Sequence, residues 1–179
     1  MGSAIVIIDV QCGLFDVVPR PFEADEVISR INELSERARK EGVPVIFIQH
    51  EQAQGILEHG SQGWELVPGL IAKQSDYIVR KSTPDSFQKT GLDELLQSLK
   101  VSDVIVCGYA TEFCVDTTVR RSAALGYSVQ LAADAHTTHD KEHATASVIR
   151  LHHNETLSHI RSFGPVIQAV KAKDIRITT

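Results

Sequence analysis

Apolar runs of strand length alternate with segments of helical periodicity along this chain of 179 residues. The strand-like runs cover residues 4–10, 43–49, 76–80, 103–108, 128–132 and 156–160, and the last of them has the weakest pattern. Helical patterns cover residues 24–41, 92–99, 112–125, 140–153 and 165–172. Strands that alternate with helices favour a doubly wound α/β fold with right-handed crossovers. The length suits a single domain that spans residues 1–179.

One segment, residues 51–69, interrupts this alternation. It is long and irregular for a connection between a strand and the next element, and it holds four glycines, a proline and the only tryptophan, Trp64. Long irregular connections often form lids or binding loops. The sequence leaves two interpretations open, a selectivity loop and a plain surface excursion.

Three reactive side chains stand at or just past the ends of strand-like runs. Asp9 ends the first run, Lys81 follows the third, and Cys114 comes shortly after the fourth. Each has an ordinary explanation, as a turn carboxylate, a solvated cation or a buried structural thiol. In an open α/β sheet, however, ligands bind outside the carboxyl ends of the strands. Their common position therefore predicts a shared site.

The surroundings of Cys114 predict a reactive thiol. The apolar run stops at Gly108, and Thr111 with Glu112 behind it suits the start of a helix, with Thr111 as the N-cap. A cysteine in the first helical turn meets unpaired N–H groups and the positive end of the helix dipole. Both favour the thiolate over the thiol, so we expect Cys114 to react quickly near neutral pH.

Several ordered motifs in the chain resemble those of the isochorismatase-like cysteine hydrolases, over residues 4–143. They are Asp9 on the first strand, Lys81 followed by Ser86-Phe87 and Thr90-Gly91-Leu92, Gly108-Tyr109-Ala110-Thr111 ahead of Cys114-Val115, and Asp134-Ala135 with Thr137 and His143. The resemblance implies a three-layer fold, with a six-stranded, mostly parallel sheet and helices on both faces. It also implies a homo-oligomer, a dimer or larger.

The same resemblance implies an Asp-Lys-Cys triad that hydrolyses a small non-peptide amide through a thioester. Cys114 would be the nucleophile, Asp9 the base that later activates water, and Lys81 the cation that favours both anions. The peptide bond between Tyr109 and Ala110 would be cis, and the N–H groups of Ala110 and Cys114 would bind the oxyanion.

Aromatic side chains near these motifs predict the walls of the substrate pocket. They are Phe15, Trp64, Phe87, Tyr109 and Phe113. Stacking and burial against such walls reward a flat or apolar acyl group, so the sequence favours a small neutral amide over an anionic one.

No cofactor or metal is expected. Nicotinamidase-like members carry Asp-x-His at the end of the second strand, whereas this chain reads Gln49-His50-Glu51 there, with only His59 nearby. The late histidines favour a polar helix face, although His139 is within reach of the pocket mouth. Cys107 is expected in the core and Cys12 in a packing role.

Composition excludes several other classes of protein. The net charge is −5 and no cluster of Lys and Arg exceeds three residues, so nucleic acid is not an expected partner. No apolar stretch approaches the ~20 residues that span a bilayer. The first strand begins without room for a signal peptide, and three cysteines are an odd number. Both observations favour a reduced, cytoplasmic setting.

Two other functions compete with an amide hydrolase. An isochorismatase-type enzyme that cleaves a vinyl ether needs the Asp and the Lys, but such enzymes typically lack the cysteine, which Cys114 supplies here. A non-catalytic module could have kept the pocket for ligand binding or interaction. A reactive Cys114 would distinguish the enzyme from such a module.

Overall fold

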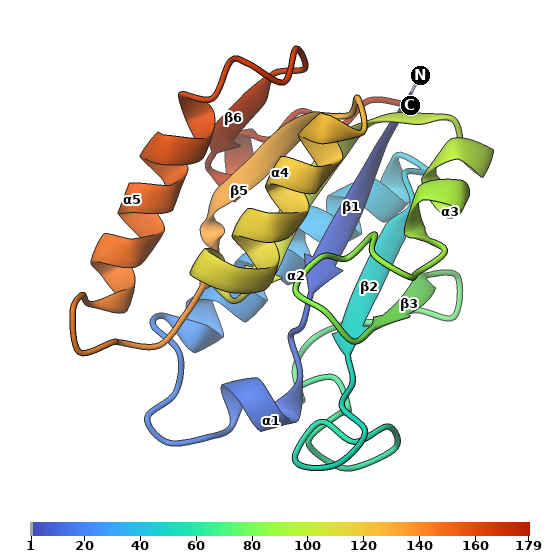
Figure 1. Cartoon of the computed structure of the whole chain (residues 1–179). Coiled ribbons are helices and arrows are strands. Elements are labelled where there is room, and N and C mark those ends of the chain that lie inside the picture. The colour runs from blue at the N-terminus through green and yellow to red at the C-terminus, as the bar shows by residue number, and fades with distance from the viewer. Residues whose placement is uncertain (1) are drawn as a thin grey trace.

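The computed structural model describes residues 2–179 and contains a six-stranded parallel sheet with helices on both faces (Figure 1). The strands are β1 Gly2–Ile8, β2 Val45–His50, β3 Tyr77–Lys81, β4 Val101–Tyr109, β5 Ser128–Thr137 and β6 Ile167–Val170. The α-helices are α1 Cys12–Phe15, α2 Ala24–Lys40, α3 Leu92–Ser98, α4 Asp116–Ala124 and α5 Ala146–Ser158. A π-helical turn, η1 Thr111–Val115, precedes α4, and a 3-10 turn, η2 Ala172–Asp174, follows β6.

The strand order places the candidate residues at one point of the sheet. The order is β3-β2-β1-β4-β5-β6, and every neighbouring pair is parallel. The chain therefore winds first to one side of β1 and then, from β4 onward, to the other. Ligands of doubly wound sheets bind at such a reversal. The expected six-stranded, doubly wound fold is confirmed, and the sheet is parallel throughout.

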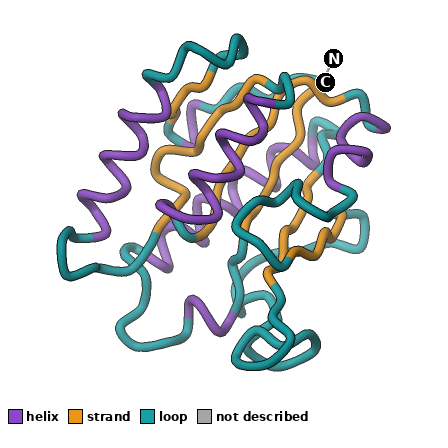
Figure 2. Tube along the Cα trace, viewed as in Figure 1, coloured by secondary structure: helices purple, strands orange, loops and turns teal. Residues whose placement is uncertain are grey.

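Two hydrophobic cores lie on the two faces of the sheet, as Figures 1 and 2 show by the helices in front of it and behind it. On one face, Ile5 and Ile7 of β1 pack with Val27, Ile31 and Leu34 of α2. On the other face, Val6 and Ile8 of the same strand pack with residues of α3 and α4. Successive side chains of a strand point to opposite faces, so β1 is apolar at every position from Ala4 to Ile8 because both faces are covered.

The structure corrects the predictions for the last third of the chain. Residues 156–160, predicted as a strand, lie at the end of α5 and just beyond it, and β6 falls within residues 165–172, which were predicted as a helix. Short apolar runs do not distinguish a strand from a helix by periodicity alone. The helix expected over residues 140–153 begins later, at Ala146, where Thr145 caps it and Asp140 accepts a bond from the Ala146 N–H.

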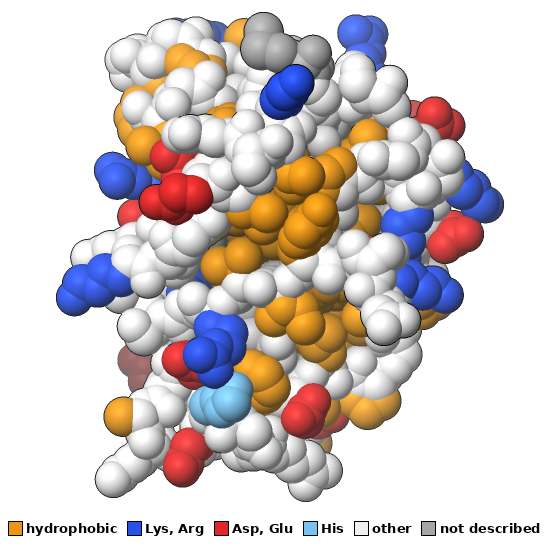
Figure 3. All heavy atoms as spheres, turned by 90° about the vertical axis from the view of Figure 1, so that its right-hand side faces the viewer, with side chains coloured by type: hydrophobic (Ala, Val, Ile, Leu, Met, Phe, Trp, Pro, Cys, Tyr) orange, Lys and Arg blue, Asp and Glu red, His pale blue; other side chains and the backbone are white. Residues whose placement is uncertain are grey.

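Hydrophobic side chains gather on the side of the molecule that carries α3 and the edge strand β3 (Figure 3). On β3 itself, Tyr77 is 38% and Ile78 60% exposed. Among the described residues, no helix has both the length and the apolar character needed to cross a membrane.

Candidate active site

Asp9 directly follows β1 and has a left-handed backbone conformation, and its carboxylate is buried at the carboxyl end of the strand. Its backbone has φ 52°, in the left-handed region, and its N–H donates to the Ile48 carbonyl at 2.9 Å. This region is sterically costly for most residues and least so for Asn and Asp, whose short polar side chains are tolerated there. The side chain is buried, so the carboxylate needs a cation beside it.

Lys81, the last residue of β3, supplies that cation. Its side chain is fully buried, and its Nζ lies 2.7 Å from Asp9 Oδ2 and 3.2 Å from Cys114 Sγ. The ammonium also lies 3.0 Å from His50 Nδ1 and 3.2 Å from the Thr83 carbonyl oxygen. The structure thus brings Asp9, Lys81 and Cys114 together around one ammonium group, at the edge where the sequence places them.

Cys114 is held by the turn that follows β4. Gly108 has φ 114° and lies against β1, where a Cβ would come 2.1 Å from the Ile8 carbonyl oxygen, so only glycine fits. The Tyr109–Ala110 peptide bond is cis. The Ala110 carbonyl then accepts bonds from the N–H groups of Phe113 and Val115, which closes the turn around the half-buried Cys114.

Thr111 does not cap this turn, contrary to the prediction. It lies inside η1, and Ala110 precedes the turn without a side-chain cap. The Thr111 hydroxyl is buried and bonds to Nδ1 of His136 at 2.9 Å, while Nε2 of the same ring bonds to Asn154. The tertiary contact to β5 satisfies the hydroxyl, so it has no need of a local partner.

The sequence favours the thiolate of Cys114 from its place at the start of a helical turn, but the burial of the thiol opposes this. Burial raises the pKa of Cys114 to about 12, with the Asp9 carboxylate acting in the same direction and Lys81 against both. The resting site therefore holds a neutral thiol beside an Asp9–Lys81 ion pair. Oδ1 of Asp9 is buried and has no hydrogen-bond partner among the described residues, which leaves it able to accept a proton.

His50 and Gln11 also belong to the site, although the sequence did not predict them there. His50 ends β2, is aligned with Lys81 in the sheet and contacts its ammonium. Gln11 is buried and bonds to both backbone groups of His50, through its Oε1 at 2.8 Å and its Nε2 at 3.0 Å. For Gln11 the available signal was the same as for Asp9, a polar residue directly after an apolar one, whereas His50 is separated from the apolar run by Gln49.

Two of the five predicted pocket aromatics belong to the core instead. Phe87 is 7% exposed and stacks on Tyr127, just before β5, with ring centroids 6.2 Å apart. Phe15 is fully buried and meets the Tyr109 ring edge-on at 5.8 Å. Both side chains are buried against other aromatic rings. Phe87 is therefore not a pocket wall, and Phe15 packs against Tyr109 from the core side.

The other three aromatics lie nearer to the solvent. Tyr109 bonds through its hydroxyl to His139 Nδ1 at 2.8 Å, and burial raises its pKa to about 12. Phe113 is 54% exposed, with the Lys141 ammonium 5.6 Å from its ring centre. Trp64 is half-buried and touches the His59 ring.

Segment 51–69 returns to the carboxyl edge of the sheet. The Trp64 carbonyl accepts bonds from Gln11 and Gln49, and Leu66 forms a bridge with Gln11. Cys12 of α1 donates through its thiol to the Leu66 carbonyl, which supports a packing role. Cys107 is fully buried in the core, as expected.

Comparison with known proteins places the chain in a family. The sequence model of the isochorismatase domain matches residues 3–167. The chain belongs to the isochorismatase family. A streptothricin hydrolase of Streptomyces noursei is 36% identical over 139 residues, which cover 77% of this chain and 50% of that protein. The chain thus spans about half the length of this relative.

Other members of the isochorismatase family cover more of their length. Nicotinamidase 3 of Arabidopsis thaliana is 27% identical over 83% of this chain and 80% of its own. A crystal structure described as an isochorismatase family protein is 31% identical, with a TM-score of 0.85 over 94% of this chain and 98% of the other.

In the described part of the chain, the one group of side chains that could act as metal ligands does not suit a metal ion. Among the described residues, Asp9, His50 and Cys114 form that set, with ligand atoms within 4.8 Å of one another. The Lys81 ammonium bonds to all three, and a divalent cation there would face a buried positive charge. The donor set holds a cation that belongs to the chain.

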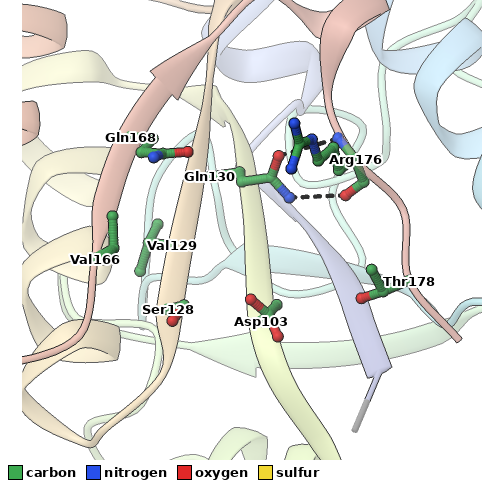
Figure 4. Close-up of a pocket in the computed structure, with 8 residues that line it drawn as sticks. All are labelled: Asp103, Ser128, Val129, Gln130, Val166, Gln168, Arg176 and Thr178. Carbon is green, nitrogen blue, oxygen red and sulfur yellow. Dashed lines mark hydrogen bonds between the residues drawn. The ribbon is translucent and has the colours of Figure 1, made fainter.

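A separate hollow lies at the amino ends of the strands, on the side of the sheet opposite to the candidate active site. It is lined by residues at the starts of β4 and β5, including Asp103 and Ser128, and by the chain's C-terminal segment (Figure 4). Gln130 crosses it and donates to the Arg176 carbonyl at 2.7 Å. Because strands of a parallel sheet share one carboxyl edge, this hollow is remote from Asp9, Lys81 and Cys114.

The buried ion pair predicts a large effect on stability. Lys81→Met should lower the free energy of unfolding by about 3–5 kcal/mol, because Asp9 is left buried without its cation. Urea unfolding would measure the change, with Lys73→Met, on an exposed lysine, as the control. A loss as small as that of the control would contradict the ion-pair account.

Proposed function

We propose that the chain is a cysteine-dependent hydrolase of small non-peptide amides. The observation that carries this proposal is the buried contact of one ammonium, Lys81, with both the Asp9 carboxylate and the Cys114 sulfur. A nucleophile, a base and a fixed cation within bonding distance are what acyl transfer requires. The family membership supports hydrolysis, as do relatives described as a streptothricin hydrolase and a nicotinamidase.

The first half of the reaction forms a thioester. Cys114 Sγ attacks the amide carbon, and its proton passes to Asp9 as the carbon–sulfur bond forms. The tetrahedral intermediate then collapses, the carbon–nitrogen bond breaks, and the proton on Asp9 goes to the leaving nitrogen. Asp9 can act this way because the thiol is neutral at rest, so base and nucleophile carry one proton between them.

The second half returns the free enzyme. Asp9 takes a proton from a water molecule, the hydroxide adds to the thioester carbon, and the carbon–sulfur bond breaks to release a carboxylic acid. The departing sulfur takes back the proton that Asp9 holds. Lys81 remains charged throughout and stabilises each anion in turn, while the N–H groups of Ala110 and Cys114 are the proposed oxyanion donors.

The vinyl-ether alternative lacks a comparable observation. It leaves Cys114 without a part to play, although the Lys81 ammonium lies 3.2 Å from its sulfur. A binding module would not need a nucleophile beside a buried base. We therefore retain amide hydrolysis. That the reaction needs no metal or other cofactor, and that the chain forms a homo-oligomer in the cytoplasm, remain predictions.

The proposal is tested by a panel of small amides with ammonia or amine release as the readout. We expect turnover of at least one neutral amide by the wild type, and none by Cys114→Ala. Hydrolysis of a vinyl ether and of no amide would support the alternative. A preference for anionic amides would contradict the neutral-substrate prediction.

Segment 51–69 is the proposed selectivity loop, with Trp64 as the residue that meets the substrate. Its indole Nε1 is buried and has no partner among the described residues. Trp64→Ala should raise KM about tenfold and change kcat much less, because it removes binding that ground state and transition state share. Trp64→Phe, which keeps an aromatic wall, should change KM less. Steady-state kinetics would test this, and a fall in kcat alone would oppose it.

A further inference from the structure

His50 is a titratable group that touches the ion pair but takes no part in the mechanism above. Its Nδ1 lies 3.0 Å from Lys81 Nζ, and the two residues are aligned across β2 and β3. We propose that His50 is a positioning residue, whose neutral imidazole holds the Lys81 ammonium against Asp9 and Cys114. This inference rests on the function proposed above.

The geometry requires the neutral ring. An ammonium can only donate, so Nδ1 of His50 must accept, and the ring proton then lies on Nε2. A protonated imidazole carries hydrogens on both nitrogens. It would lose this bond and place a second positive charge beside Lys81.

The backbone of His50 is fixed independently of the ion pair. Gln11 accepts from its N–H and donates to its carbonyl, and Gln11 is itself fully buried. The neighbouring Glu51 N–H donates to the Lys81 carbonyl at 2.8 Å. The imidazole and the lysine therefore meet on two rigid, adjoining strand ends, and this rigidity is what a positioning contact needs.

Four contacts fix the position of the ammonium. Asp9, His50, Cys114 and the Thr83 carbonyl all lie within 3.2 Å of Lys81 Nζ. Loss of the His50 contact would release the ammonium on the side of β2 and let it shift within the site. Its alignment with the Cys114 sulfur would then weaken.

The charges around His50 keep its ring neutral. Burial and the Lys81 ammonium lower the pKa of His50, while Asp9 and Glu51 act in the opposite direction. Glu51 is itself paired with Arg80 at 3.7 Å, and the neutral Cys114 thiol is the remaining titratable neighbour. As the pH falls through the lowered pKa of His50, the ring gains a proton and the bond to Lys81 is lost. The reactivity of Cys114 should fall with it.

Alkylation of Cys114 by iodoacetamide tests this inference without knowledge of the substrate. The full chain is treated from about pH 5 to pH 8, and peptide mass spectrometry separates Cys114 from Cys12, which serves as an internal reference. His50→Gln offers an acceptor that cannot titrate, and His50→Leu offers none. His159→Gln, on an exposed histidine beyond α5, is the control.

The expected result has two parts. In the wild type, the rate at Cys114 falls more steeply towards acid than the rate at Cys12, and His50→Gln removes that excess. His50→Leu lowers the rate at Cys114 about tenfold near pH 8, the worth of one hydrogen bond to a charged group, and this difference from the wild type shrinks towards acid, where the wild type has lost the bond as well. His159→Gln matches the wild type. Thermal unfolding checks each variant, and His50→Gln decides if His50→Leu does not fold.

Wild-type rates and slopes in both His50 variants would overturn the inference. If Lys81→Met still slowed alkylation in that case, the triad would stand and only the role of His50 would be lost. If Cys114→Ala retained turnover, the proposed function would fail instead.

Discussion

Cys114→Ala is expected to abolish amide hydrolysis, with a loss of at least about 10⁴-fold in kcat, while the fold is retained. The loss follows because the substitution removes the sulfur that forms the proposed thioester. Cys114→Ser should be nearly as inactive, since a hydroxyl is far less acidic than a thiol and Asp9 would have to remove its proton. Steady-state release of ammonia or amine measures the effect.

Cys12→Ala is the matched control, because it removes a half-buried thiol that contacts the Leu66 carbonyl rather than Lys81. It should keep turnover close to that of the wild type. Wild-type kcat in Cys114→Ala would remove the nucleophile from the mechanism and leave the binding module as the better explanation.

Asp9→Asn is expected to lower kcat by about 10²- to 10⁴-fold, the usual worth of general base catalysis. The amide has nearly the shape of the carboxylate, but it cannot take the thiol proton and leaves the Lys81 ammonium without its anion. Rates of turnover of the same small amide would show the loss.

Asp16→Asn, on an exposed carboxylate just after α1, provides the comparison and should leave kcat unchanged. An Asp9→Asn enzyme within a few-fold of the wild type would mean that another group accepts the proton.

The carboxyl ends of the strands, where the site lies, could be predicted from the sequence because β1, β2 and β4 are buried on both faces. Such strands appear as continuous apolar runs, so their ends are visible. Asp9 comes directly after one such run, and Cys114 comes shortly after another. Parallel strands share a carboxyl edge, which is why side chains from three distant segments could be assigned to one site.

What the sequence could not predict depends on contacts between distant segments. The pKa of Cys114 was expected to be low from its place in a helical turn, but burial and the Asp9 charge raise it. Thr111 looked like a cap until His136 of β5 supplied its partner. His50 was given no part in the site because its surroundings do not match the metal motif, and only the alignment of β2 with β3 reveals its contact with Lys81.

Two further predictions, Phe87 as a pocket wall and residues 165–172 as a helix, were wrong because contacts with other elements decide the outcome. Phe87 was predicted to line the pocket because it is aromatic and lies near the motifs, yet the loop after β3 turns it onto Tyr127 in the core. β6 is four residues long, too short for either period to be recognised, and its strand character comes from pairing with β5.

The central claim, a covalent intermediate on Cys114, is tested most directly by acid quenching during turnover. Wild-type enzyme is mixed with an amide that it hydrolyses, quenched within the first turnovers, and analysed by intact-mass and peptide mass spectrometry. The account predicts a mass increase equal to the acyl group, located on the Cys114 peptide, removed by hydroxylamine and absent from Cys114→Ala. Turnover by Cys114→Ala without any adduct, or an acyl group on another residue of the active enzyme, would contradict it.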